Sequence, residues 1–378
     1  HMIFTSYNQE MAQEGLRQLE LIVNNQQSPE QTKHQALRND MTTSLENEID
    51  TKEDALKIAN NPESREIADA YALLARIYAG PRFTWEESNF PENNMRTYQC
   101  LHDSIRRCSP IGTLQALRIN GTITPTVEKD MLISFNDAFH IVYDYAKQGD
   151  AFCQYIIGNV FFWRDDDRIS LARDMITPPR LSLAKRIQQS LQKGSIQERI
   201  STLQGTVSDE TLQENATTFA KEWFNKALNN GLAMFQGNLR NIYIDEGDFD
   251  NARRVALTAA ELGNPTMMLY TGLDCHEHGK FEDAFTWFTK GAALGQAEST
   301  AELADYYYHF YDTKELRRLI PYNPVKAIGL YRRAATKHFS DAGYAALQAA
   351  FGYIFHIGHL PLDWGLIADL THMAATKE

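Results

Sequence analysis

The sequence predicts an all-α fold in which antiparallel helix pairs stack into a solenoid. Two observations lead to this prediction: an internal 32-residue period, and a helical spacing of small and apolar residues within each period. The length of 378 residues suits an elongated array, and the 43% of apolar residues supplies the core that stacked units require.

The period is clearest between residues 220 and 295. The segment AKEWFNKALNNG (220–231) recurs one period later as ARRVALTAAELG (252–263), and after another period as AFTWFTKGAALG (284–295). Each copy begins with Ala, has a small residue seven positions later and ends with Gly. This spacing predicts a helix with a face of small residues, on which the next helix can lie closely, and a glycine that ends the helix.

The connections between these helices repeat as well. GDFDNA (247–252) and GKFEDA (279–284) are also one period apart, and we expect their glycine to end one helix and Asp or Asn to begin the next. A fourth copy, AIGLYRRAATKH (327–338), begins later than the period predicts, after a turn lengthened by KELRRLIPYNP that ends at Pro324. A weaker copy upstream is AFHIVYDYAKQG (138–149).

The pattern A-x-x-W/Y-x-x-(A/G)-A-x-x-G, followed by a second helix, resembles the Sel-one-like repeat, a relative of the tetratricopeptide repeat. The resemblance is clear over residues 216–358 and extends back to residue 70, although the 32-residue period is shorter than is usual for the family. It implies a right-handed α-α superhelix that holds a protein or peptide partner in its concave groove, as an adaptor, a regulator, a toxin-neutralising protein or an effector. It implies neither catalysis nor a cofactor. The residues that match best are Trp287, Gly291, Ala292, Gly295, Tyr331, Ala334 and Ala335.

Interruptions of the period suggest how the chain is organised. Pro178 and Pro179 break any helix at that point, and the following LSLAKRIQQSLQKG is typical of an amphipathic helix outside the repeat. The polar first helices are typical of a cap on the end of a solenoid. We therefore expect a helical cap at 1–69, degenerate repeats at 70–163, an inserted excursion at 164–215 and regular repeats at 216–378.

The charge distribution bears on possible partners. The net charge of −12 disfavours general attraction to nucleic acid phosphates, but residues 164–200 hold eight basic and five acidic side chains. A nucleic-acid-associated protein that uses this basic segment is therefore an alternative. An enzyme with a site built by the insertion and the amino-terminal region is a weaker one, because no known catalytic motif is present. The basic residues singled out are Arg173, Arg180, Lys185 and Arg186.

The repeat alignment also predicts which residues face a partner. In solenoids of helix pairs the first helix of each pair lines the groove, so equivalent positions form a ladder. Leu239, Thr271 and Leu303 lie in the core register. A neighbouring register runs through Ile244, His276 and Tyr308, another begins at Arg240, and the aromatic run 306–311 has rings on every side. The candidate partner-binding residues are Arg240, Ile244, His276, Tyr308 and Tyr311.

Possible metal ligands are few. Cys275–His278 (CHEH) is the one close group, but alternate residues of a helix point to different sides, so no metal site is predicted. The run Asp165–Asp167 lacks the spacing of a calcium loop, and a solvated turn is the favoured interpretation.

The cysteines and the segment at the start of the sequence bear on the compartment. The four cysteines form no CxxC pair, and neither a secretion signal nor a membrane span is recognisable. Cys153 is expected to be an inert core thiol. These features favour a reducing, cytoplasmic setting, and delivery to a host or neighbouring cell without a cleavable signal stays open.

Overall fold

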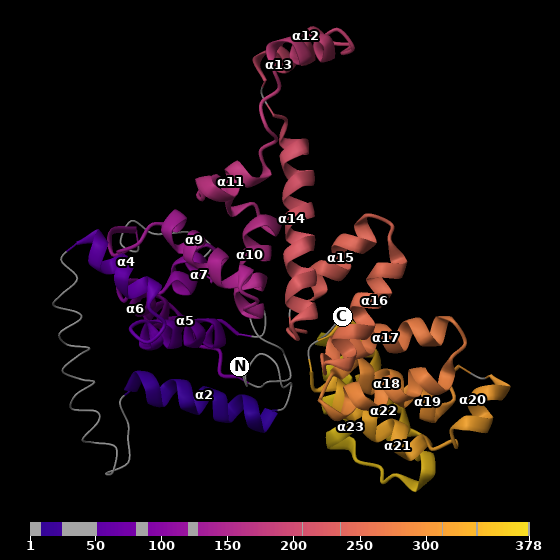
Figure 1. The fold of residues 1–378 in the computed structure, drawn as a ribbon. Coiled ribbons are helices and arrows are strands. Elements are labelled where there is room, and N and C mark those ends of the chain that lie inside the picture. Colours follow the sequence, from indigo (N-terminus) through magenta and orange to yellow (C-terminus); the bar gives the residue numbers. More distant parts are fainter. Residues whose placement is uncertain are drawn as a thin grey trace. The chain divides into compact units, whose positions relative to one another are not determined.

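The computed structural model is all-helical in the residues that it describes (Figure 1). The prediction of an all-α fold built from stacked helix pairs is confirmed there, and none of these helices is long and apolar enough to cross a membrane. The described residues are 9–24, 51–80, 90–119, 128–205, 207–234, 236–311, 313–337 and 339–376.

The described residues divide into two compact units: those between 13 and 232 form the first, and residues 9–12 belong with those from 233 to 376 in the second. In the first unit, consecutive helices from α5 to α10 pack on one another, and α10 then packs on α14. Its helices are the greater part of α2 (Gln9–Asn24), then α4 (Lys52–Asn60), α5 (Glu66–Tyr78), α6 (Asn94–Arg106), α7 (Pro110–Ile119), α9 (Phe135–Lys147), α10 (Ala151–Phe162), η3 (Asp165–Asp167), α11 (Ser170–Ile176), α12 (Leu183–Ser190), α13 (Ile196–Gln204) and α14 (Asp209–Asn229).

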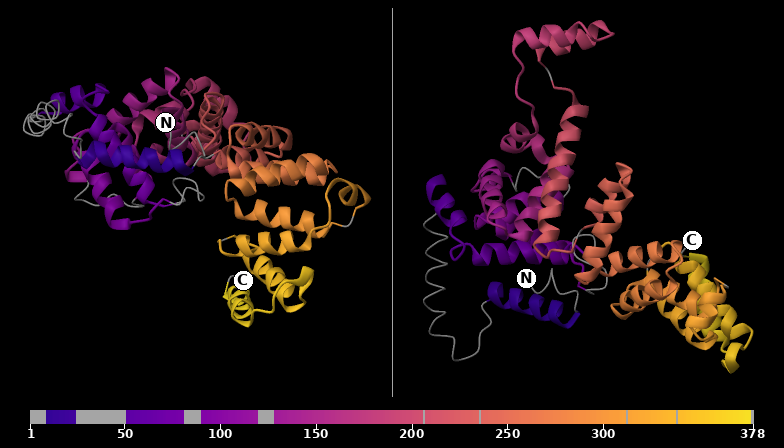
Figure 2. Two further views of the ribbon diagram at one scale, coloured as in Figure 1. Left: turned by 90° about the horizontal axis from the view of Figure 1, so that it is seen from below. Right: turned by 45° about the vertical axis from the view of Figure 1, so that its right-hand side comes forward.

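In the second unit, each long helix packs on the one before it and the one after it, which is the packing of a solenoid. Figure 2 shows the stack in chain order, from orange to yellow. Its helices are α15 (Gly237–Asp245), α16 (Phe249–Glu261), α17 (Pro265–Glu277), α18 (Phe281–Ala293), α19 (Ala297–Tyr308), α20 (Lys314–Leu319), α21 (Pro324–Ala335), α22 (Ala342–Ile354), η4 (Ile357–His359) and α23 (Trp364–Thr376).

The glycines that close the repeat copies end helices as predicted. Gly231, Gly263 and Gly295 have φ values of +88°, +102° and +94°, which residues with a Cβ rarely adopt. The residue after each glycine donates its N–H to a carbonyl of the last helical turn, for example Asn264 to Ala259 at 2.9 Å. The 32-residue period therefore sets where each helix stops and the direction in which the next one starts.

Two helix pairs are held closely together by a glycine on the first helix and an aromatic ring on the second. A Cβ added to Gly272 in α17 would lie 2.6 Å from the Phe288 ring of α18, and one added to Gly158 in α10 would lie 2.5 Å from the Phe224 ring of α14. Phe224 and Phe288 are buried and stand two periods apart. The α10–α14 pair is therefore a repeat pair whose two helices are separated in sequence by the excursion.

The excursion proves shorter than residues 164–215. η3 and α11 pack within the first unit, and α14 already begins at Asp209, because Leu212 and Ala216 are buried with the rest of its inner face. α11 ends at Ile176, just before the two prolines. What lies outside the packed helices is the pair α12 and α13, which pack on each other.

The close contact between Gly272 and Phe288 predicts the effect of adding a methyl group at Gly272. Gly272→Ala should lower the free energy of unfolding by about 1–3 kcal/mol, because the added methyl group overpacks the Phe288 ring. Gly329→Ala, in the exposed middle of α21 where an added Cβ meets nothing within 4 Å, is the matched control. It should leave stability unchanged or raise it by up to about 1 kcal/mol. Chemical unfolding of the two variants compares them, and equal effects would show that the close approach is unimportant.

Candidate binding pocket

The α15–α16 pair does not have this glycine-and-aromatic contact. Arg240 in α15 stands one period before Gly272, and Ala256 in α16 stands one period before Phe288. The large and small side chains are thus exchanged between the two helices. An alanine cannot fill the volume that a phenylalanine ring fills in the next pair. Space therefore remains between α15 and α16 beside Ala256.

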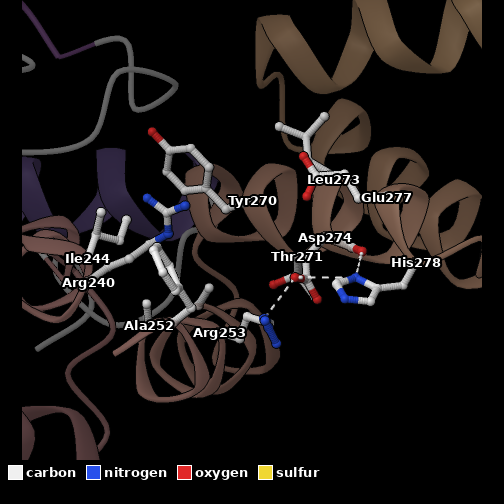
Figure 3. Close-up of a pocket in the computed structure, with 12 residues that line it drawn as sticks. Arg240, Ile244, Ala252, Arg253, Tyr270, Thr271, Leu273, Asp274, Glu277 and His278 are labelled. Atoms are coloured by element: carbon white, nitrogen blue, oxygen red, sulfur yellow. Dashed lines mark hydrogen bonds and ion pairs between the residues drawn. The ribbon is translucent and has the colours of Figure 1, made fainter. Parts of the chain in front are cut away.

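A pocket of about 400 Å³ lies at this opening, between α15, α16 and α17. Figure 3 shows side chains from all three helices around it. Both Arg240 and Ala256 line it. The lining residues are Arg240, Ile244, Phe249, Ala252, Arg253, Ala256, Tyr270, Thr271, Leu273, Asp274, Glu277 and His278.

The guanidinium of Arg240 lies over the ring of Tyr270, 3.9 Å from its centroid. Both side chains are half-buried. Within the part of the chain that the structure describes, Arg240 makes no ion pair, so its hydrogen-bond donors are available to a ligand. A guanidinium held flat on an aromatic ring keeps its charge and has little freedom left to lose on binding.

Acidic side chains gather at the other end of the pocket. Asp274 pairs with Arg253, whose Nε lies 3.1 Å from its Oδ1, and Arg253 also reaches Asp250 at 3.2 Å. His278 Nδ1 lies 2.7 Å from the backbone oxygen of Asp274. Glu277, the last residue of α17, is exposed and makes no ion pair among the described residues.

The predicted partner-binding residues fall into three places. Arg240 and Ile244 line the pocket. His276 and Tyr311 lie together in an aromatic cluster, with ring centroids 4.3 Å apart. Tyr308 lies instead against Tyr322, with 6.1 Å between the ring centroids. The three residues of the ladder, Ile244, His276 and Tyr308, thus have different neighbours.

His276 is engaged inside the protein. Its Nδ1 is 2.7 Å from the hydroxyl of Tyr306, and its ring also packs on Phe281. Burial lowers the pKa of His276, which favours the neutral ring. Tyr306 itself is fully buried, and Tyr311 donates to Glu302 at 3.0 Å. Packing and hydrogen bonds of the array thus account for most of the aromatic run, while Phe310 is left exposed.

The basic residues of the excursion hold the chain together locally. Arg180 and Arg186 donate to the carbonyls of Gln204 and Leu203, at the end of α13. Such contacts satisfy carbonyls that a helix end leaves free and suit its negative dipole end. Lys185 is exposed, and its backbone N–H meets the hydroxyl of Ser182 at the start of α12.

The interpretation of Asp165–Asp167 as a solvated turn was wrong for its first two residues. Asp165 and Asp166 are buried, and Asp165 pairs with Arg118 of α7. Arg164 and Arg173 bind Asp166 at 2.9 and 2.6 Å, and these hydrogen bonds outweigh burial and lower the pKa of its carboxyl. The partners Arg118 and Arg173 come from other helices, which the local sequence could not reveal.

The cysteines and histidines give no metal centre in the described residues, where no three His, Cys, Asp or Glu side chains come together to hold an ion. His276 and His278 each bond to other groups of the protein. Cys153 is buried in α10, and burial raises the pKa of its thiol, as expected of an unreactive core cysteine.

Three residues important to the pocket were missed by sequence reasoning: Tyr270, Ala256 and Glu277. Ala256 could have been found, because the 32-residue alignment places it between Phe224 and Phe288. Tyr270 and Glu277 have no comparable signal, since their importance depends on which side of α17 faces α15 and α16.

A buried acid in the array predicts a pH dependence of stability. Burial raises the pKa of Asp305 to about 7, although its carboxylate accepts a hydrogen bond from Tyr331. The folded state therefore holds a proton that the unfolded state releases near pH 4, so stability should fall as the pH rises from about 4 to 7. In Asp305→Asn part of this fall should disappear in chemical unfolding at pH 5 and pH 8. The control Asp283→Asn, at an exposed position of α18, should keep the wild-type slope. An unchanged slope in Asp305→Asn would contradict the assignment.

No protein-family model and no curated protein matches the chain. Among solved structures, the Sel1 repeat protein from Oxalobacter formigenes is similar at 15% identity and a TM-score of 0.45, over 95% of this chain and 89% of that one. A protective antigen of uropathogenic Escherichia coli with an SLR fold is similar at 15% identity and a TM-score of 0.38, over 83% of this chain and 64% of that one. Both carry the repeat designation that the sequence motif resembles, and the helix-pair fold itself stands on the packing described above.

Proposed function

We propose that the chain is a non-catalytic helical-repeat scaffold that binds a protein or peptide partner in the pocket between α15, α16 and α17. Arg240 carries the proposal, because its cation lies on Tyr270 at the pocket without an acidic partner in the described residues. A carboxylate of the partner would supply the missing charge and accept two of its hydrogen bonds.

The pocket also has the character of a recognition site. Ile244, Phe249 and Leu273 offer apolar surface, and the charged groups lie around it. Phe249 is 57% exposed although it begins α16, which leaves a large ring available for contact. Binding sites commonly combine an apolar surface with a few fixed polar groups.

The nucleic acid alternative has less support. Three of the four basic residues that suggested it are engaged within the chain: Arg173 with Asp166 and Asp167, and Arg180 and Arg186 with backbone carbonyls. These side chains would have to give up internal partners in order to bind phosphates. The cytoplasmic setting stays part of the proposal, since the four cysteines are free thiols.

The test compares two cations that each lie on an aromatic ring. Lys290 lies over Trp287 in α18 at 4.2 Å, outside the pocket, and serves as the matched control for Arg240. Affinity purification from the producing cells should recover at least one polypeptide with wild type and with Lys290→Gln. Arg240→Gln should retain it at least about tenfold less, because a charged hydrogen-bonded contact is lost. Equal recovery with both variants would contradict the proposal.

A further inference from the structure

The pocket has a positive end and a negative end, and both are fixed by α17. Tyr270, on which Arg240 lies, and Glu277 are seven residues apart in this helix. At the rise of an α-helix their Cα atoms are separated by about 10 Å along the axis. Figure 3 shows Arg240 and Tyr270 on one side of the close-up, and Asp274, Glu277 and His278 on the other.

The negative end has an excess of acidic groups. Arg253 is shared between Asp250 and Asp274, so one cation faces two carboxylates, and Glu277 adds a third. The end of α17 also carries the negative pole of the helix dipole. His278, the remaining titratable group that lines this end, bonds to the backbone oxygen of Asp274 and lies 3.6 Å from its Oδ1. A positively charged group of a ligand would be favoured at this end.

The pocket also offers apolar surface. Ile244 of α15 and Leu273 of α17 line it, together with Phe249, and Figure 3 shows Ile244 on the side of Arg240 and Leu273 on the side of Glu277. A peptide in the extended polyproline II conformation advances by about 3.1 Å per residue and completes a turn in three residues, so side chains three residues apart lie on the same side, about 9 Å apart. With two residues between them, an acidic and a basic side chain would therefore both face the pocket.

From these observations we infer that the pocket selects a peptide segment in the polyproline II conformation in which an acidic and a basic residue are separated by two others. The acidic residue pairs with Arg240 and the basic one with Glu277. This inference rests on the proposed function and adds to it the charge pattern of the partner. Either chain direction satisfies it, because the charges and not the backbone set the order.

The experiment uses a phage-displayed library of random dodecapeptides, selected on the full chain. The selected peptides should be enriched in an acidic and a basic residue at this separation. Glu277→Lys is the variant and Glu261→Lys its matched control, since Glu261 is the exposed last residue of α16 as Glu277 is of α17. Lysine suits the end of a helix, so both variants should fold.

A labelled peptide with the selected pattern should bind wild type and Glu261→Lys equally, and Glu277→Lys at least tenfold more weakly. The same peptide with its basic residue changed to glutamate should bind Glu277→Lys at least tenfold better than wild type. If selected peptides depend on Arg240 but respond alike to Glu277→Lys and Glu261→Lys, the charge pattern is wrong and the proposed function stands. If they bind Arg240→Gln as well as wild type, the proposed function fails with it.

Discussion

The closest approaches of one helix to the next depend on a small residue beneath a neighbouring side chain, which in two helix pairs is an aromatic ring. Gly158 under Phe224 and Gly272 under Phe288 leave no space for a methyl group, and in the last regular pair Ala304 and Tyr331 belong to the same buried cluster. Glycine in a helix costs about 0.5–1 kcal/mol relative to alanine, so its presence at two such positions indicates that the packing recovers more than this.

This constraint explains which irregularities the chain tolerates. Between α10 and α14 the connection is lengthened by η3, α11 and the α12–α13 pair, yet the two helices keep their contact through Gly158 and Phe224. A longer connection adds little to the entropic cost of closing the loop. Losing the contact between Gly158 and Phe224 would instead open the core. Where the small and the large side chain change places between the two helices, at Arg240 and Ala256, a pocket is present.

How far the sequence predicted this follows from the range of each interaction. The helix ends at Gly231, Gly263 and Gly295 are local features, and the 32-residue alignment located them. The same alignment proposed Arg240 and Ile244 for the binding surface. It could not predict that Tyr308 and His276 contact different residues, because the neighbours of the aromatic run lie on other helices. It also missed the burial of Asp166, whose pairing depends on tertiary packing.

The exchange between Arg240 and Ala256 is tested most directly by a double-mutant cycle of unfolding free energies. Arg240→Gly should enlarge the opening, and Ala256→Phe should overpack against the guanidinium. Together they recreate the pair Gly272 and Phe288, so the double variant should be more stable than the sum of the single changes by more than about 1 kcal/mol. Additive changes would contradict the origin of the pocket given above.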